Sequence, residues 1–520
     1  MSFVSAGFIG FLAASVLLYY IVPKRLRWVM LLAASYVFYL SGGLKTVGFL
    51  LLATLSTWGA GLLLHRQNGL RKDADKAALA VIKRRKKWIV AASLLINLGM
   101  LFVFKYLSFT ESAIAALLGK LGIAWSPKQP ELLLPLGVSF FVFQSVGYVI
   151  DQYRGKYEAQ KNPLKYALFT SFFPQMVQGP ISRYNELSGQ LYEGNDFRAE
   201  NLRSGIQLML WGYLKKMVIA DRAAVLVNSF FGSMDSYGGA VTAFSIFLYC
   251  IELYCDFSGG IDIARGAAEL FGITLAENFR RPIFATSLAD YWRRWHITLG
   301  SWMRDYVFYP LSLSKPFGRL NKWARRRIGG KLGKIFATSL ATFVVYLLIG
   351  LWHGGNFRYI AFGFWNGALI TASLLLGNVF HVLREKLHIR AESPAWKLFS
   401  MARTAFLVFI GRYITRAPRL RSALSLLRRT FTDFRGGELT NGTVVQMGLP
   451  GKDLIVIAVC TLVLLLVEIH QERHGSMRDT LSKKSGFVQW LAMLIPMAAI
   501  LFLGILRGSY IASEFIYRQF

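Results

Sequence analysis

The 520-residue chain is poor in cysteine and in acidic residues. Its cysteines are isolated and odd in number, which indicates neither a disulfide framework nor a cysteine metal site. It also lacks Walker and Rossmann glycine signatures, internal repeats and low-complexity tracts, so the common nucleotide-binding loops and repeat architectures are excluded. The three cysteines are Cys250, Cys255 and Cys460.

The scarcity of acidic residues leaves a large positive charge. There are 28 Asp and Glu residues against 60 Lys and Arg, a formal net charge of +32. Such a charge can indicate nucleic-acid binding, but here the basic residues flank apolar runs, at 24–27, 66–87 and 412–435. Basic residues in that position report membrane orientation and contact with anionic lipid. We therefore expect a lipid bilayer as partner and no nucleic acid.

Long apolar blocks are what the chain has in abundance. Hydrophobic residues make up 54% of it, with a mean hydropathy of +0.41, which is typical of a polytopic membrane protein. A spanning helix needs about 20 mostly apolar residues, and about eleven spans are expected. The candidate segments are 3–22, 28–41, 45–64, 88–107, 132–150, 203–220, 240–257, 335–352, 357–377, 397–411, 453–469 and 487–506.

Two further segments, 164–182 and 283–313, mix Pro, Gly, Arg and Asp with aromatic residues. Irregular backbone is tolerated at membrane depth only inside protein or along a cavity, so these segments are predicted to be re-entrant or in-plane. The positive-inside rule places Lys24–Arg27, Lys83–Lys87 and Lys156–Lys165 in the cytoplasm and the N-terminus outside.

Two histidines fall within segments expected in or against the membrane. His296 lies in Tyr291-Trp-Arg-Arg-Trp-His-Ile-Thr, and His353 lies in Leu351-Trp-His-Gly-Gly355. An ionisable group at that depth costs a few kcal/mol unless it faces a bundle interior or a wet cavity, so function is its default explanation. The alternative is a core histidine that bonds between helices. The other five are expected to be solvated: His65, His381, His388, His470 and His474.

Several motifs follow one another in a recognisable order. They are the segments Leu134–Arg154, beginning Leu-Pro-Leu-Gly, and Phe172–Tyr184, beginning Phe-Phe-Pro-Gln-Met, then Tyr254-Cys-Asp-Phe-Ser-Gly-Gly-Ile-Asp262, Glu277-Asn-Phe279, the Trp-His-Ile-Thr block and Trp352-His-Gly354. In this order they resemble the membrane-bound O-acyltransferases, in particular the bacterial branch of alginate O-acetyltransferase and teichoic-acid D-alanyltransferase.

The resemblance implies an all-α polytopic membrane protein, a ring of about eleven transmembrane helices with re-entrant or in-plane helices around a central funnel. It implies one acyltransferase domain over 1–520. His353 matches the family's catalytic histidine and His296 the second, accessory one. Asn366 stands where many alginate-type relatives carry a further histidine, so no third histidine is expected at the site.

The chemistry agrees with this assignment. A hydroxyl that attacks a thioester must lose a proton, and an imidazole is well matched to accept it at neutral pH, so His353 is the expected general base. His296 or Asn356 is a candidate donor to the oxyanion. No metal site is expected, because neither histidine has a second ligand at metal-binding spacing.

Carboxylates occur near these motifs at Asp256, Asp262, Asp290 and Asp305. At membrane depth such groups usually pair with cations, and Arg293, Arg294 and Arg304 are close in sequence, so the carboxylates are expected to be architectural. The alternative for Asp305 is to orient a histidine, as a carboxylate does in a catalytic triad.

The chain ends in Glu514-Phe-Ile-Tyr-Arg-Gln-Phe520, directly after the last apolar run. We expect residues 485–520 to form a C-terminal span followed by an exoplasmic aromatic tail. This resembles the tyrosine-centred ending of alginate-type acetyltransferases and of the small partner of the D-alanylation system, which implies that Tyr517 accepts the acyl group. The alternative for Tyr517 is an aromatic anchor at the membrane interface.

The sequence thus favours an enzyme, an O-acyltransferase of the bacterial cytoplasmic membrane. We expect it to move an acyl group from a cytoplasmic thioester to hydroxyls of an extracellular or cell-wall polymer, and acetyl is the expected group. The expected cosubstrate is acetyl-CoA or an acylated carrier protein, with no tightly bound cofactor, and an exoplasmic partner is expected by analogy. D-alanyl transfer from a carrier protein to teichoic acid is the alternative within the class. A transporter is the alternative outside it, but repeated halves with matched broken helices are not evident.

Overall fold

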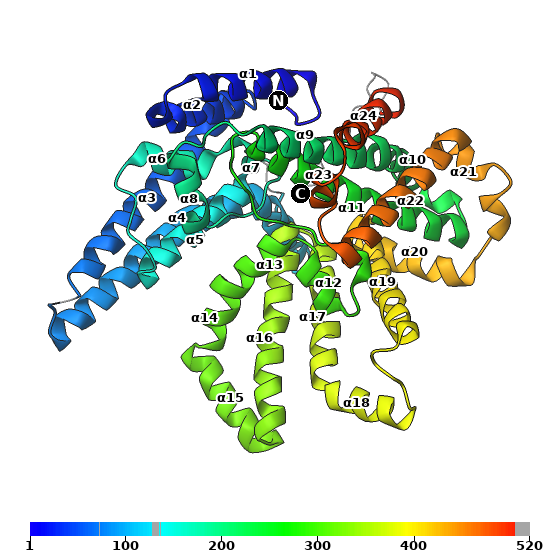
Figure 1. Cartoon of the computed structure of the whole chain (residues 1–520). Helices are drawn as coiled ribbons and strands as arrows, with labels where there is room; N and C mark the ends of the chain where they lie inside the picture. Colours follow the sequence, from blue (N-terminus) through cyan, green and yellow to red (C-terminus); the bar gives the residue numbers. More distant parts are fainter. Residues whose placement is uncertain (72, 127–134, 136, 505–520) are drawn as a thin grey trace.

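The computed structural model describes residues 1–71, 73–126, 135 and 137–504, and in these residues the fold is built from helices (Figure 1). The only β-type pairing among them is an isolated antiparallel bridge between Phe279 and Trp295. The predicted all-α architecture is confirmed.

Seven described helices are long and apolar enough to cross a membrane, and a bent pair raises the number to eight. The pair is α17 (Phe357–Leu375) with α18 (Gly377–Lys386), which meet at 61°. The seven helices are α3 (Val47–Gly69), α4 (Lys76–Lys120), α11 (Gly239–Glu269), α16 (Gly330–His353), α19 (Pro394–Arg416), α22 (Gly451–His474) and α24 (Gly486–Leu503).

The remaining apolar segments form helices shorter than a regular span. They are α1 (Ala6–Ile21), α2 (Arg27–Leu40), α5 (Val138–Arg154) and α9 (Ala199–Tyr213), with 14 to 17 residues each. Nearly every residue of α5 is buried, so this helix is enclosed by protein. Apolar runs therefore located these helices, but fewer of them than the expected eleven have the length of a span.

Glycines bring α9 against α11 at the centre of the molecule. A Cβ added at Gly205 would lie 2.7 Å from the carbonyl oxygen of Gly266, and one at Gly212 would lie 2.6 Å from that of Gly259. Small residues allow such close helix contacts in membrane proteins. This contact fixes α11, which carries part of the site described below.

The two interrupted segments, predicted to be re-entrant or in-plane, are each made of short helices. The first contains α6 (Pro163–Ser171), which is buried from Tyr166 onward, and α7 (Phe173–Met176), which is buried throughout. The second contains α12 (Leu288–Arg294), α13 (Ile297–Met303), a π-helical turn at Arg304–Phe308, and α14 (Tyr309–Ser312). After α14, α15 (Lys315–Ile328) leads into α16, and α16 and α17 lie side by side in the lower part of Figure 1.

A buried ionic cluster joins α11 to a π-helix at Leu214–Ala220. The Lys216 ammonium is fully buried and lies 2.5 Å from Asp256 and 2.8 Å from Asp221. The neighbouring Lys215 lies 2.7 Å from Asp262. Asp256 and Asp262 therefore have the expected architectural role, but their partners are lysines far away in sequence.

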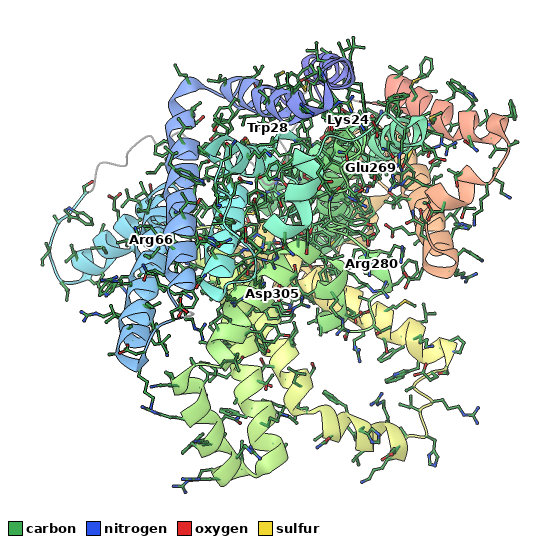
Figure 2. All side chains as sticks on the ribbon, turned by 60° about the vertical axis from the view of Figure 1, so that its left-hand side comes forward. Lys24, Trp28, Arg66, Glu269, Arg280 and Asp305 are labelled. Carbon is green, nitrogen blue, oxygen red and sulfur yellow. The ribbon has the colours of Figure 1, made fainter. Side chains whose placement is uncertain are left out.

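The first basic connection packs against a distant loop. Lys24 pairs with Asp196 at 2.6 Å, and the Arg27 guanidinium donates to the Asn195 carbonyl oxygen at 2.6 Å. Figure 2 shows Lys24 and Trp28 close together on this side of the molecule. The ammonium of Lys165 lies 5.6 Å from the Trp28 ring centre. The basic groups expected on one side of the membrane, at 24–27 and 156–165, therefore adjoin each other.

Candidate active site

His353 is the last residue of α16. The chain leaves the helix through Gly354, whose φ of 153° favours glycine. The imidazole packs against three aromatic rings, with centroid distances of 5.0 Å to Trp352 and 6.1 Å to both Tyr359 and Phe362. A backbone turn between two apolar helices thus carries the ionisable group into an aromatic environment.

Beside His353 is a small cavity of about 30 Å³. Residues from α11, α12, α16, α17 and α19 converge on it, and Arg412 supplies a positive charge. Its guanidinium lies 5.2 Å from the Trp295 ring centre and donates to the Tyr291 hydroxyl at 2.7 Å. The lining residues are Tyr249, Leu253, Trp292, Trp295, His353, Tyr359, Phe362, Arg412 and Thr415.

His296 occupies the turn between α12 and α13 with φ 49° and ψ 52°, a left-handed conformation that is uncommon outside glycine. Short backbone pairing holds this turn: Arg280 N–H donates to the Arg294 carbonyl oxygen at 2.8 Å, and Ile297 N–H to that of Asn278 at 3.0 Å. Such conformations often mark functional positions. The side chain is buried, with 1% of its surface exposed.

The Asn278 side chain determines which ring nitrogen of His296 carries the proton. Asn278 Oδ1 accepts from Thr298 N–H at 3.0 Å, which identifies this atom as the oxygen of the amide. His296 Nδ1 lies 3.2 Å from the same oxygen and must therefore donate to it. In the neutral ring Nε2 is then an acceptor, so an oxyanion role for His296 would need the protonated ring.

His296 and His353 both pack against the indole ring of Trp352. The Trp352 ring centroid lies 5.7 Å from that of His296 and 5.0 Å from that of His353. The fold therefore unites two residues that are 57 positions apart (353 − 296). Among the histidines predicted to be solvated, His381, His388 and His474 are exposed, and His65 and His470 are half-buried.

Helix α4 supports the end of α16. Lys105 Nζ donates to the Trp352 carbonyl oxygen at 3.0 Å and lies 5.2 Å from its ring centre. The Tyr106 hydroxyl donates to the Leu351 carbonyl oxygen at 2.8 Å. A Cβ on Gly355 would lie 2.7 Å from that of Phe109, so this glycine permits α4 to approach. Sequence reasoning missed Lys105, although a lysine within an apolar run was a signal.

The two asparagines singled out from the sequence both have structural partners. Asn366 Oδ1 accepts from Trp292 Nε1 at 3.1 Å, so Asn366 holds one of the indoles that line the cavity. Asn356 is the N-cap of α17, where its side-chain oxygen accepts from Arg358 N–H at 3.0 Å. Asn278, by contrast, had no role assigned from sequence, and its only signal was the Glu277-Asn-Phe279 motif.

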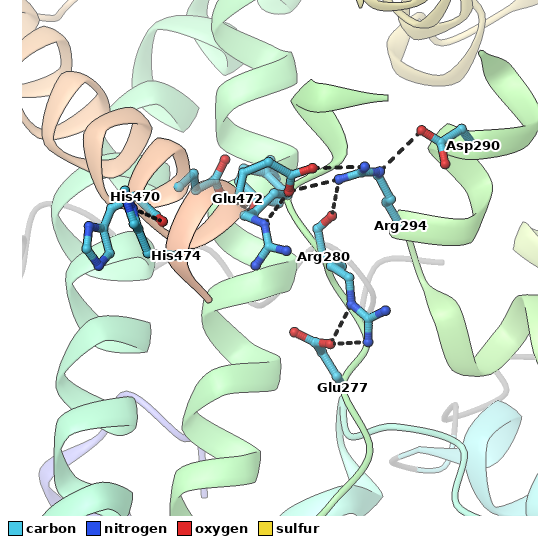
Figure 3. Close-up of polar contacts among 10 residues, drawn as sticks. Glu277, Arg280, Asp290, Arg294, His470, Glu472 and His474 are labelled. Atoms are coloured by element: carbon cyan, nitrogen blue, oxygen red, sulfur yellow. Dashed lines mark hydrogen bonds and ion pairs between the residues drawn. The ribbon is translucent and has the colours of Figure 1, made fainter. Parts of the chain in front are cut away.

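Ion pairs fasten the turn that carries His296 to α22 (Figure 3). Arg294 binds Asp290 at 3.3 Å and Glu472 at 3.0 Å, and Arg281 binds Glu472 at 2.6 Å. Burial alone lowers the pKa of Arg294, but hydrogen bonds to Glu472 and Asp290 and their charges outweigh it and raise that pKa. The predicted pairing of Asp290 with Arg294 is present, whereas Glu472 was not anticipated.

Asp305, labelled in Figure 2, pairs with Arg183 at 2.9 Å and with Arg304 at 3.2 Å. The Arg183 guanidinium also lies 4.3 Å from the ring centre of Tyr306, whose hydroxyl donates to Asp151 at 2.8 Å. These contacts agree with the architectural role of Asp305.

Tyr517, the third predicted site residue, lies outside the described residues.

The position of Asn278 leads to a prediction. Asn278→Leu should lower kcat about 10- to 100-fold, by analogy with the loss seen when a metal-binding histidine loses the partner that orients it, with KM for the acyl donor unchanged. Asn278→Asp keeps the accepting oxygen and should retain most activity. Steady-state kinetics with matched thermal midpoints would test this. Equal losses in the two variants would show that Asn278 has only a packing role.

The sequence is similar to those of known membrane-bound acyltransferases. The sequence profile of the membrane-bound O-acyltransferase family matches residues 160–386. The probable alginate O-acetylase of Pseudomonas aeruginosa is 31% identical over 427 residues, 80% of this chain and 72% of that protein. The peptidoglycan O-acetyltransferase of Helicobacter pylori is 27% identical over 81% of this chain and 76% of that protein.

A third relative, the teichoic acid D-alanyltransferase of Bacillus subtilis, is 26% identical over 55% of this chain and 69% of that protein. These similarities and the helical fold around two histidines define a multi-pass membrane enzyme that transfers acyl groups to oxygen. The chain belongs to the membrane-bound O-acyltransferase family.

Proposed function

We propose that this enzyme transfers an acetyl group from a cytoplasmic thioester to hydroxyls of an extracellular or cell-envelope polysaccharide. The observation that carries the proposal is the position of His353, at the end of a membrane span and beside a cavity where five helices converge. The names of the relatives support the reaction, because one is a probable alginate O-acetylase and another a peptidoglycan O-acetyltransferase.

In this mechanism His353 is the general base. It removes the proton of the attacking hydroxyl while that oxygen bonds to the thioester carbonyl carbon. The C–S bond then breaks, and the proton passes from the imidazolium to the departing thiolate, which leaves as a thiol. No net proton is gained or lost. Positioned acid–base catalysis of this kind typically contributes about 10²- to 10⁴-fold.

His296 has an accessory role in the same step. Asn278 Oδ1 accepts the hydrogen bond from His296 Nδ1–H. While the ring is neutral, His296 Nε2 can therefore accept a hydrogen bond but cannot donate one. Arg412 is the charged group that lines the cavity with His353, and it supplies a positive potential for the developing oxyanion. The proposed site therefore contains His296 and Arg412 in addition to the general base His353.

Tyr517 is proposed as a relay. A phenol with a pKa of about 10 leaves more readily than an alkyl alcohol, so the acyl group can pass downhill from thioester to phenyl ester to sugar ester. His353 would deprotonate Tyr517 in the first transfer, and the acylated tail would present the group on the outer face. In this scheme an exoplasmic partner completes the transfer to the polymer. The enzyme would lie in the bacterial cytoplasmic membrane.

The relay is tested by the intact mass of the purified protein after incubation with acetyl-CoA, with a D-alanyl carrier protein, or with neither. We expect an acetyl adduct that maps to Tyr517 and is missing from Tyr517→Phe and from His353→Ala. Tyr517→Phe should also abolish polymer acetylation in cells, because it removes the accepting oxygen. Tyr510→Phe, in the same segment, is the matched control and should keep both.

The adduct identifies the acyl donor, and the variants test the individual steps of the mechanism. A D-alanyl adduct would replace acetylation by D-alanyl transfer. Full polymer acetylation by Tyr517→Phe would remove the relay and leave direct transfer at His353. Retained acyl transfer by His353→Ala would contradict the proposed chemistry itself.

A further inference from the structure

A second cavity, of about 390 Å³, lies next to the site between α11, α19 and α22. Its walls are mainly hydrocarbon, from residues such as Ile251, Phe409, Leu464 and Leu465. For comparison, an engineered apolar cavity of about 150 Å³ stays dry and takes up apolar guests. A larger cavity with similar walls is therefore expected to hold an apolar molecule.

The open end of this cavity is bordered by exposed apolar side chains. Its rim is formed by Phe247, Ile283 and Phe406, whose exposed fractions are 53%, 52% and 53%. Helices α11, α19 and α22 are all long and apolar enough to cross a membrane. If these helices cross the membrane, the medium at this rim is lipid hydrocarbon. A lipid chain that enters sideways would then pass from one apolar environment into another and would not cross water.

The inner end of the cavity adjoins the active site. Trp295 and Arg412 line both this cavity and the one beside His353. At another edge the Tyr254 hydroxyl donates to the Glu468 carboxylate. An apolar guest that fills the space would thus pack against the back of the Trp295–Arg412 pair and keep water away from it.

Thr461 offers a way to test occupancy. It lines the cavity from α22, and its buried hydroxyl has no hydrogen-bond partner among the described residues. Replacing it by valine keeps its volume and removes no hydrogen bond that the structure describes. Replacing it by phenylalanine places a ring in the cavity. The neighbouring Leu462 is 55% exposed and does not line the cavity.

We propose that this cavity is a lipid site, which holds one hydrocarbon chain of a bilayer phospholipid inserted between α11, α19 and α22 with its end near Trp295 and Arg412. The chain is part of the wall of the catalytic region and is not a substrate. This inference does not depend on the identity of the acyl donor, the acceptor or the relay.

The test uses the full-length protein in vesicles of phosphatidylethanolamine and phosphatidylglycerol that contain a phospholipid with a diazirine near the end of one acyl chain. After irradiation, peptide mapping should find adducts concentrated on the cavity-lining parts of the three helices, at 247–255, 404–409 and 461–465. Thr461→Phe should lose most of these adducts. Thr461→Val and Leu462→Phe should keep them.

Two results would overturn the proposal. One is adducts spread evenly over the lipid-facing helices, or missing from the three walls because another segment or ligand fills the cavity. The other is unchanged labelling in Thr461→Phe. Should that variant fail to fold, Ala405→Phe fills the same space from α19, and the same labelling decides. Labelling needs no acyl donor, so its outcome is separate from that of the proposed acetyl transfer.

Discussion

Replacing His353 by alanine is expected to lower acyl transfer by about 10²- to 10⁴-fold, the range that a positioned general base contributes. The imidazole is held by Trp352, Tyr359 and Phe362 at the end of a span, beside the cavity lined by Arg412. Because the proton of the hydroxyl must be removed as the new bond forms, losing the base should reduce kcat, with little change in the KM for the donor.

The measurement is the initial rate of thiol release by the purified protein, followed with the acyl donor and a hydroxyl acceptor. His381→Ala is the matched control, because His381 is exposed and its nearest described ionic partner is Glu385, 3.4 Å away. It should retain full activity. His353→Gln keeps much of the side-chain volume, and activity in this variant comparable with the unchanged protein would refute the general-base role.

Replacing Lys216 by methionine is expected to cost about 3–5 kcal/mol in unfolding free energy, the usual penalty for removing one partner of a buried ion pair. The Lys216 ammonium is fully buried between Asp221 and Asp256. Methionine is close to lysine in shape, so the loss comes from two buried carboxylates that are left without their cation. The unfolding midpoint in detergent or in lipid nanodiscs reports the change.

The charge explanation has its own control. Adding Asp256→Asn to Lys216→Met removes one uncompensated charge and should recover part of the stability. Lys24→Met, which breaks the exposed pair with Asp196, should leave the midpoint unchanged. Equal destabilisation by the single and double variants would show that packing, and not charge, makes Lys216 necessary.

Much of the fold was predictable because membrane helices obey a local rule. Runs of about 20 apolar residues located the spans, and Pro, Gly and charged residues located the broken segments around α6 and α13. The rule did not separate true spans from short buried helices such as α5. The reason is that an apolar face against protein and one against lipid have the same composition.

The two candidate histidines were singled out for a related reason. An ionisable group in an apolar context is costly wherever the segment folds, and His296 and His353 were recognisable on that basis. Their supporting residues were not. Lys105 contacts Trp352 from 247 positions away in the chain, and Asn278 reaches His296 through a paired turn. Only packing between distant helices creates such contacts, so local sequence carries little trace of them.

The order of apolar and basic segments was sufficient to predict a polytopic helical membrane protein, since insertion into a bilayer depends on local hydropathy. The motifs were sufficient to name its family. The convergence of five helices on His353, the proton position on His296 and the apolar cavity behind Arg412 arose from the three-dimensional arrangement. These depend on how side chains from separate helices fill shared space, and hydropathy along the chain does not encode that arrangement.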